Sequence, residues 1–524
     1  MLTLLPPELI HKICESLYSW RKIQNLHLAS VFDVFRMLSV SNVEVQGRAP
    51  SSLGNLRLVC KELNAVIIPL LFSEVVFDFY ADVNRNPDAS LASHLQQVAY
   101  GNSPLCSNAQ TLRISALCPR QKISNNAERR IREALIEDCL ESYLGQAISC
   151  MKNLRYVCME KLSIQDMKYF PLILPHLSAL PLEHLSMDAG DFFNWTAPLP
   201  IPNTTTVTKL KLVLNAELAF ISSTVDQIRD AVMSNSLLED LDIQLSHTRA
   251  DSPCQNLLIS SPNIVSLRAL KHLRITHSLL SEDAAVITHI PVMKSLKLQG
   301  MDPTLSSIWD NLKSSNIHLE ELEVDSFSRP MMGYIASFSG LTRFVMLEVN
   351  APKKPDYLGA AALEEDSEFF FKVALPNHCA TITTLQIHAN TWRPFCFCPS
   401  FAKSLMPCFR LTDCSLTLNY DEGVEQALQF MITSIISRPS SKQLRSLTLF
   451  SAATTQKLDI VTQHWQLHHK QANATVRWLR SIEIHEPDQY PQIIHLPQID
   501  DVPLLVMTPC SEQEGVFKYV KEYK

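Results

Sequence analysis

A six-residue pattern, with apolar residues at its first, fourth and sixth positions, recurs along this chain and constrains its fold more than any other feature. The clear copies are ALPLEHLSM at 179–187, VTKLKL at 207–212, LEDLDI at 238–243, LKHLRI at 270–275, MKSLKL at 293–298, LEELEV at 319–324, LTRFVM at 341–346, ITTLQI at 382–387, LRSLTL at 444–449 and LRSIEI at 479–484. Weaker copies are AQTLRI at 109–114, LRYVCM at 154–159 and LTDCSL at 411–416. Between positions 185 and 344, successive central residues lie 22 to 32 residues apart.

This spacing is typical of leucine-rich repeats, in which each unit supplies a short strand and a return segment. Alternate apolar residues of each strand point into a shared core, and no unit can bury its apolar face alone. We therefore predict an α/β leucine-rich-repeat solenoid over residues 109–490, with a curved parallel sheet and helices or irregular segments on its convex side. A set of ordinary strands in an α/β domain would also produce the L-x-L pattern. The central leucines expected to be buried are Leu210, Leu241, Leu273, Leu296, Leu322, Leu385 and Leu447.

Two wide gaps between copies, 112 to 157 and 344 to 385, predict insertions into the repeats. The first gap contains an amphipathic helix, expected over about Ala127 to Met151. The second contains the acidic and aromatic stretch LEEDSEFFF at 363–371, for which a loop or a helix on one rim is expected.

The N-terminal segment MLTLLPPELIHKICESL has the features of a short amphipathic helix. Pro6 and Pro7 fall in the first turn, where the missing N–H costs little. Leu9, Ile13 and Leu17 then recur at four-residue steps and form one apolar face. A second segment, LRLVCKELNAVIIPLLF at 56–72, fits two short helices broken at Pro69. Taken alone, such helices could simply pack on their own domain.

Together these two segments resemble the F-box, the module that docks a substrate receptor onto the Skp adaptor of cullin-based ubiquitin ligases. The resemblance implies a small all-helical domain ahead of the repeats. Residues 18–55 separate its halves by about twenty residues more than in the family, and could be a surface loop, an extra helix or a gene-model error. The residues implied to bind the adaptor are Leu5, Pro6, Pro7, Leu9, Ile10, Ile13, Leu17, Leu58, Val59, Cys60 and Leu63.

The resulting domain organisation has four parts. Residues 1–77 form the F-box-like domain with its insertion at 18–55, and residues 78–108 form a linker. Residues 109–490 form the repeats, and residues 491–524 form a C-terminal cap or tail. The resemblance implies a non-catalytic substrate-recognition subunit of a Skp–cullin–F-box ligase, whose partners are the adaptor, a cullin and a target protein. The alternative is a repeat scaffold for protein interactions without a ligase role.

Composition narrows the partners and the compartment. The formal net charge is −7 and the basic residues are dispersed, which argues against nucleic acid as a partner. No apolar run approaches the length of a membrane span, so no membrane partner is expected. The 14 cysteines are scattered rather than regularly spaced, which favours reduced thiols in the cytoplasm or nucleus.

We expect no catalytic residue, cofactor or metal. The glycines are too far apart for a phosphate-binding loop or a nucleophile elbow. His464 and His468 share a helical face but lack an activating glutamate and a third ligand. Cys396 and Cys398 form a C-x-C pair without a second pair at finger spacing. Zinc is therefore the weaker interpretation of this cysteine-rich stretch, and buried thiols of the repeat core the stronger.

A target-binding surface can be predicted from the repeat pattern. Residues that flank the central apolar position of each strand point away from the core, onto the concave face. Their charge alternates from repeat to repeat, so the interpretation is open between a partner-binding patch and a solvated face whose opposite charges pair across strands. The predicted target-binding residues are Lys209, Lys211, Asp240, Asp242, Arg274, Lys297, Glu321 and Glu323.

Overall fold

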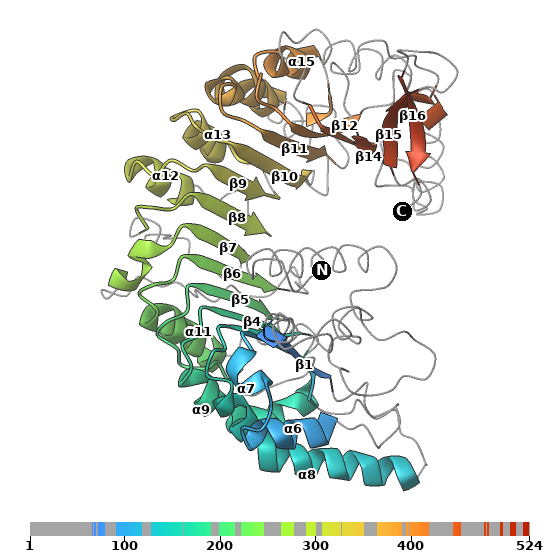
Figure 1. The fold of residues 1–524 in the computed structure, drawn as a ribbon. Helices are drawn as coiled ribbons and strands as arrows, with labels where there is room; N and C mark the ends of the chain where they lie inside the picture. Colours follow the sequence, from blue (N-terminus) through green and yellow to red (C-terminus); the bar gives the residue numbers. More distant parts are fainter. Residues whose placement is uncertain are drawn as a thin grey trace. The chain divides into compact units, whose positions relative to one another are not determined.

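The computed structural model (Figure 1) describes a defined part of the 524-residue chain. The described ranges are 72–78, 91–117, 127–160, 162–189, 199–214, 222–245, 264–276, 290–299, 307–325, 327–349, 364–389, 395–397, 399–418, 444–451, 476–477, 479–480, 493–495, 504–509 and 517–522, with Ala65, Ile68 and Pro69. The adaptor contacts implied by the resemblance lie outside the described residues. They are Leu5, Pro6, Pro7, Leu9, Ile10, Ile13, Leu17, Leu58, Val59, Cys60 and Leu63.

The chain divides into two compact units. Unit 1 comprises residues 1–257 and 261–270, and unit 2 comprises residues 258–260 and 271–524. In both units each strand pairs with the next strand along the sequence, which is the strand order of a repeat stack.

The sheet of unit 1 consists of parallel neighbours in sequence order. Its strands are β1 (Glu74–Asp78), β2 (Thr111–Ala116), β3 (Tyr156–Met159), β4 (His184–Ala189), β5 (Lys209–Leu214) and β6 (Asp240–Leu245). The register places equivalent apolar residues side by side, so that Leu185, Leu210 and Leu241 form part of one buried row. The repeat pattern thus becomes a ladder of leucines in the core.

Helical return segments cover one face of this sheet (Figure 1). They are α6 (Leu91–Ala99), α7 (Leu105–Asn108), α8 (Ala127–Cys150), η3 (Ile164–Tyr169), α9 (Phe170–Ser178), α11 (Ser222–Ser234) and η4 (Ile264–Ala269). Helix α8 packs against α6 and α9 and confirms the helix predicted for the first insertion. The sheet begins at Glu74 in β1, and α6 and α7 occupy the segment expected to be a linker.

Unit 2 has the same parallel construction, but its last strands pair in the antiparallel direction. Its parallel strands are β7 (His272–Thr276), β8 (Ser295–Gln299), β9 (Glu321–Val324), β10 (Arg343–Val349), β11 (Thr384–Ala389), β12 (Asp413–Leu418), β13 (Ser446–Ser451) and β14 (Ile493–His495). Two antiparallel strands follow, β15 (Leu504–Pro509) and β16 (Phe517–Glu522). The segment 491–524, expected to be a cap or tail, therefore supplies the last three strands.

The return segments of unit 2 are short helices. They are α12 (Ser307–Ser314), α13 (Arg329–Ile335), η7 (Phe370–Ala374), η8 (Leu375–His378) and α15 (Pro399–Leu405). The acidic and aromatic stretch at the second insertion is helical from residue 364 and continues into η7 and η8. Phe370 and Phe371 are buried, and Phe371 stacks on Phe401 with ring centroids 4.5 Å apart. Phe370 lies 5.2 Å from Phe344 of β10, so aromatic rings fill this part of the core.

The repeat prediction is confirmed for most of the chain. Twelve of the thirteen predicted copies contain one strand of a sheet. The seven central leucines are at most 3% exposed. The copy at 479–484 differs: Leu479 and Arg480 are helical, the next four residues lie outside the described part, and β13 pairs with β14 instead. Within each unit the architecture is that of an α/β leucine-rich-repeat stack.

Polar side chains of the return segments join successive repeats. The Asn235 Oδ1 atom accepts a hydrogen bond from the Val207 N–H (3.1 Å), just before β5. The Tyr334 hydroxyl accepts from the Leu319 N–H (3.3 Å) before β9 and donates to the Ile317 carbonyl (2.8 Å). These side chains and His378 are buried, and in each case the acceptor comes from the return segment that follows the strand.

His378 is the third member of this group. Its Nδ1 atom accepts from the Leu341 N–H (3.1 Å) before β10, and its Nε2 atom lies 3.0 Å from the Ile335 carbonyl. Because Nδ1 accepts, Nε2 carries the proton and donates. Burial lowers the pKa of His378, which keeps the imidazole neutral in this role.

Candidate functional site: the outward face of the strands

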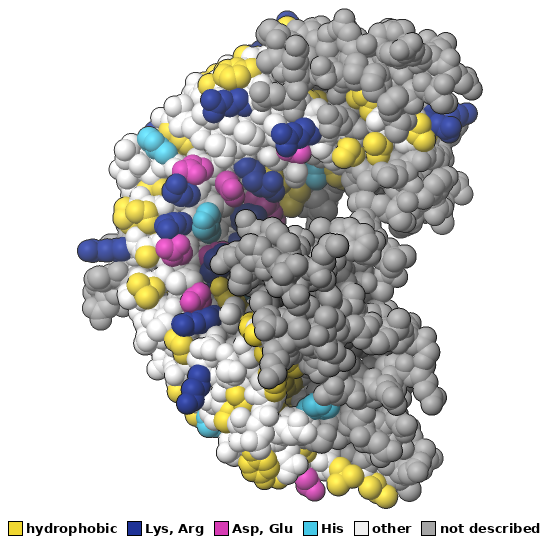
Figure 2. All heavy atoms as spheres, in the orientation of Figure 1, with side chains coloured by type: hydrophobic (Ala, Val, Ile, Leu, Met, Phe, Trp, Pro, Cys, Tyr) yellow, Lys and Arg dark blue, Asp and Glu magenta, His cyan; other side chains and the backbone are white. Residues whose placement is uncertain are grey.

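The predicted target-binding residues all lie on strands, on the side opposite the buried leucines. Lys209 and Lys211 belong to β5 and Asp240 and Asp242 to β6, in unit 1. The other four lie in unit 2, on β7, β8 and β9; they are Arg274, Lys297, Glu321 and Glu323. We call this side of the strands the outward face. In Figure 2, Lys, Arg, Asp, Glu and His side chains lie among one another to the left of the centre of the view.

In unit 2 the charges of the outward face neutralise one another. Glu323 of β9 is 8% exposed, and its Oε2 atom lies 3.2 Å from Lys297 Nζ of β8 and 3.7 Å from an Arg343 guanidinium nitrogen of β10. Glu321 accepts a hydrogen bond from the Ser295 hydroxyl (3.1 Å). For these strands the interpretation of mutual pairing is confirmed.

Arg343 was not among the predicted site residues. It occupies the same place in LTRFVM as Glu321 does in LEELEV, and the two pair in register. The repeat pattern therefore contained the signal that could have found it. Its interaction with Glu323 is diagonal, two residues further along the neighbouring strand, and no pattern of a single repeat predicts that.

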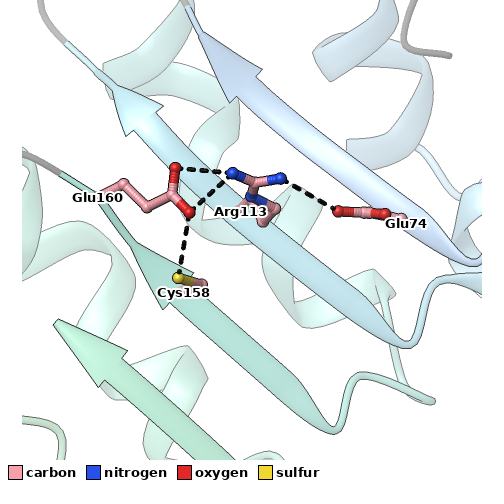
Figure 3. A network of polar contacts seen from close by, with 4 residues as sticks. All are labelled: Glu74, Arg113, Cys158 and Glu160. Carbon is pink, nitrogen blue, oxygen red and sulfur yellow. Dashed lines mark hydrogen bonds and ion pairs between the residues drawn. The ribbon is translucent and has the colours of Figure 1, made fainter. Parts of the chain in front are cut away.

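A second ion-paired group lies on the outward face of unit 1 (Figure 3). The Arg113 guanidinium of β2 donates to both carboxylate oxygens of Glu160 at 2.7 Å and lies 3.7 Å from Glu74 of β1. The Cys158 thiol lies 3.6 Å from the same Glu160 carboxylate. Burial and then the Glu160 charge raise the pKa of Cys158, so the thiol is protonated and a poor nucleophile.

Strand β5 is different. Lys209 and Lys211 are exposed, and the register places Asp240 and Asp242 of β6 directly beside them. Nevertheless neither lysine forms an ion pair with any residue of the described ranges. Asp242 instead accepts hydrogen bonds from the Gln244 amide of its own strand, at 2.8 and 2.9 Å. The two ammonium groups face solvent.

On the other side of β5, the residues of β4 directly beside the two lysines are His184 and Ser186. His184 of β4 pairs in register with Lys209 and packs edge-on against Tyr156 of β3, with ring centroids 6.3 Å apart. Burial, followed by the charge of Lys209, lowers the pKa of His184. The imidazole is therefore uncharged at neutral pH.

The cysteine-rich stretch has the geometry of a packed core. The thiols of Cys379 and Cys408 lie 3.2 Å apart, and Cys396 and Cys414 are buried as well. Both ring nitrogens of His378 contact the backbone. Across the described residues, no three His, Cys, Asp or Glu side chains lie close enough together to hold a metal ion.

One serine–histidine pair occurs on the outward face of unit 2. His388 Nε2 lies 2.8 Å from the Ser415 hydroxyl, and the imidazole packs on Phe450 with centroids 3.9 Å apart. Burial alone lowers the pKa of His388 to about 4, and no described carboxylate orients the ring. With so low a pKa the imidazole is a weak base, and the pair is a polar contact between neighbouring strands.

No family model matches the chain, and no curated protein matches it. Among solved structures it is similar to an internalin, InlF, from Listeria monocytogenes, with 14% sequence identity and a TM-score of 0.33. That similarity covers 72% of this chain and 93% of the internalin. Because this TM-score is low, the repeat architecture rests on the strand order and register of the chain itself. No helix in the described ranges is both long and apolar enough to span a bilayer.

Proposed function

We propose that this chain recognises another protein through the outward face of its strands. The observation that carries the proposal is the contrast between that face and the core. Strands with fully buried leucines on one side present charged and polar side chains on the other. Such a surface can bind a partner with little cost in ordering. The predicted residues Lys209, Lys211, Asp240, Asp242, Arg274, Lys297, Glu321 and Glu323 belong to it.

More specifically, we propose that the chain is the substrate-recognition subunit of a Skp–cullin–F-box ubiquitin ligase in the cytoplasm or nucleus. The support is the resemblance of residues 1–17 and 56–72 to the two halves of an F-box. In this role the N-terminal helices bind the adaptor and the repeats hold the target near the ubiquitin-loaded enzyme. Catalysis then comes from proximity, and this chain supplies no acid, base or nucleophile.

Adaptor binding tests the ligase role. Replacing Leu9 and Ile13 by Asp should abolish co-precipitation of the Skp adaptor and cullin, because a charge buried at an apolar interface is costly. The matched control is His11→Asp with Lys12→Asp on the polar face of the same helix, which should retain the adaptor. If wild-type chain brings down no adaptor, the chain is a repeat scaffold without a ligase role.

Identifying the target requires a second experiment. Proximity labelling in cells, with and without proteasome inhibition, should reveal a protein whose recovery rises when the proteasome is blocked. A neighbour that is recovered equally in both conditions would be a binding partner but not a degradation target.

A further inference from the structure

The two exposed lysines of β5 differ from other cations on the outward face. Arg113, Lys297 and Arg343 each pair with a carboxylate. Lys209 and Lys211 do not pair with any described acid, although two aspartates lie beside them in register. An exposed ammonium group without a protein partner can exchange its hydration water for a carboxylate of a bound protein.

The spacing of these two lysines selects a shape of ligand. They lie two residues apart on one strand, about 6.6 Å along its axis. Alternate side chains of an extended peptide have the same spacing and point to the same side. Two acidic residues separated by one residue can therefore face both lysines at once, whereas two adjacent acidic residues point to opposite sides.

The flanks of β5 narrow the ligand further. On one side the uncharged His184 and the 40% exposed Tyr156 offer an aromatic surface. On the other side Asp240 and Asp242 would repel a broad polyanion such as nucleic acid. A bound ligand is therefore expected to gain from negative charge only at positions directly over β5.

We propose that Lys209 and Lys211 bind an extended acidic segment of a partner protein, with carboxylates at alternate positions. This inference rests on the proposed role of the outward face in protein recognition and names the chemistry of the partner. The two carboxylates pair with the two ammonium groups, and the residue between them points away from the sheet. The neighbouring aromatic side chains of β3 and β4 accept an apolar residue of the same segment.

The test uses two synthetic peptides of identical composition and charge. In one the two glutamates are separated by a serine, and in the other they are adjacent. Each is incubated with the full chain and a water-soluble carbodiimide, which joins a carboxylate to a lysine amine as an amide with loss of water. Mass spectrometry then gives the cross-linking yield at Lys209 and Lys211. Lys313 of α12 and Lys403 of α15, which are also exposed, are the internal controls.

The peptide with separated glutamates should cross-link to Lys209 and Lys211 about fivefold more than the peptide with adjacent glutamates. One exposed ion pair can raise the affinity by about this factor. The control lysines should not distinguish the peptides. In a fluorescence anisotropy titration, Lys209→Gln with Lys211→Gln should lose binding of the separated peptide, and Lys313→Gln with Lys403→Gln should keep it. Equal yields from both peptides, or yields at β5 no higher than at the controls, would overturn the proposal.

Neither peptide experiment involves the adaptor. A chain that fails to bind the adaptor can still give the expected cross-links, and a chain without the cross-links can still bind the adaptor. Failure of the two proposals is therefore distinguishable.

Discussion

Strands β5–β6 and strands β8–β9 present the same kinds of charge in the same register, with different results. In unit 1 Lys211 lies beside Asp242, and in unit 2 Lys297 lies beside Glu323. Only the second pair comes within ion-pair distance. The glutamate is longer by one methylene and receives Arg343 from β10 as well, whereas the aspartate is engaged by Gln244 of its own strand. Side-chain reach and local competition, rather than charge alternation, decide which charges of the outward face pair with one another.

The largest expected effect tests whether the cores beneath β5–β6 and β8–β9 are equally well packed. Leu241 of β6 and Leu322 of β9 are at most 1% exposed. Replacing either by Ala should lower the free energy of unfolding by about 2–5 kcal/mol, because each leaves a cavity. Urea unfolding measures the loss in each variant, and region-resolved hydrogen exchange shows in which part of the chain the loss occurs. A much smaller loss at one leucine would mean that the two regions differ in their cores and not only in their faces.

A smaller effect is expected from breaking the ion-paired face. Glu323→Ala removes the acceptor shared by Lys297 and Arg343. It should lower the free energy of unfolding by about 1–2 kcal/mol, since a largely buried carboxylate lies between two partly exposed cations. Chemical denaturation of this variant beside Asp242→Ala provides the comparison. Equal losses at the two positions would contradict the distinction between a paired and an open face.

Acidification should affect unit 2 through His388. Burial lowers its pKa to about 4, below the usual value of about 6.5. Its contribution to stability is therefore complete above pH 6.5 and is lost as the pH falls toward 4, because the unfolded chain binds the proton first. The loss at pH 5.5 should be less than about 1 kcal/mol after solvent screening. Protection of the β11 and β12 amides against hydrogen exchange should decrease less on acidification in His388→Gln than in the wild-type chain. If the two proteins lose protection equally, His388 does not have this role.

The smallest effect is expected on the open face. Lys209→Gln with Lys211→Gln should change the free energy of unfolding by no more than about 0.5 kcal/mol, because neither lysine forms an ion pair with a described residue. Thermal unfolding of the double variant measures this. A clear destabilisation would show that the lysines contribute to folding and would contradict the proposal that they bind a ligand.

The repeats could be predicted because burial of alternate leucines leaves a direct mark on the sequence. Leu210 and Leu385 were identified from the L-x-L pattern alone, and both are buried. Strand β1 could not be separated from the preceding segment, since EVVFD lies outside the repeat spacing. Strands β14–β16 were missed for a related reason: β14 is only three residues long, and antiparallel pairing at the end of the sheet follows no repeat.

The sequence predicts which side chains lie on the outward face, but not which of their charges are ion-paired. The sequence places Lys209 and Glu323 on the outward face through their offset from the central leucine. Whether a given charge is paired depends on neighbours from other strands, as for Arg343 and Glu323, and on rotamers. The role of His378 could not be predicted from the sequence, because its two backbone partners lie 37 and 43 residues away and come together only in the folded repeats.

The polar acceptors Asn235, Tyr334 and His378 give the repeat stack a polarity. Each lies after a strand and satisfies a backbone N–H just before that same strand. A truncation directly after the strand therefore leaves an orphaned donor, whereas a deletion that begins at the N-terminal side removes the donor first. Shortened or recombined versions of this architecture should tolerate loss from one end better than from the other, and a graft placed after β5, β9 or β10 must bring its own acceptor.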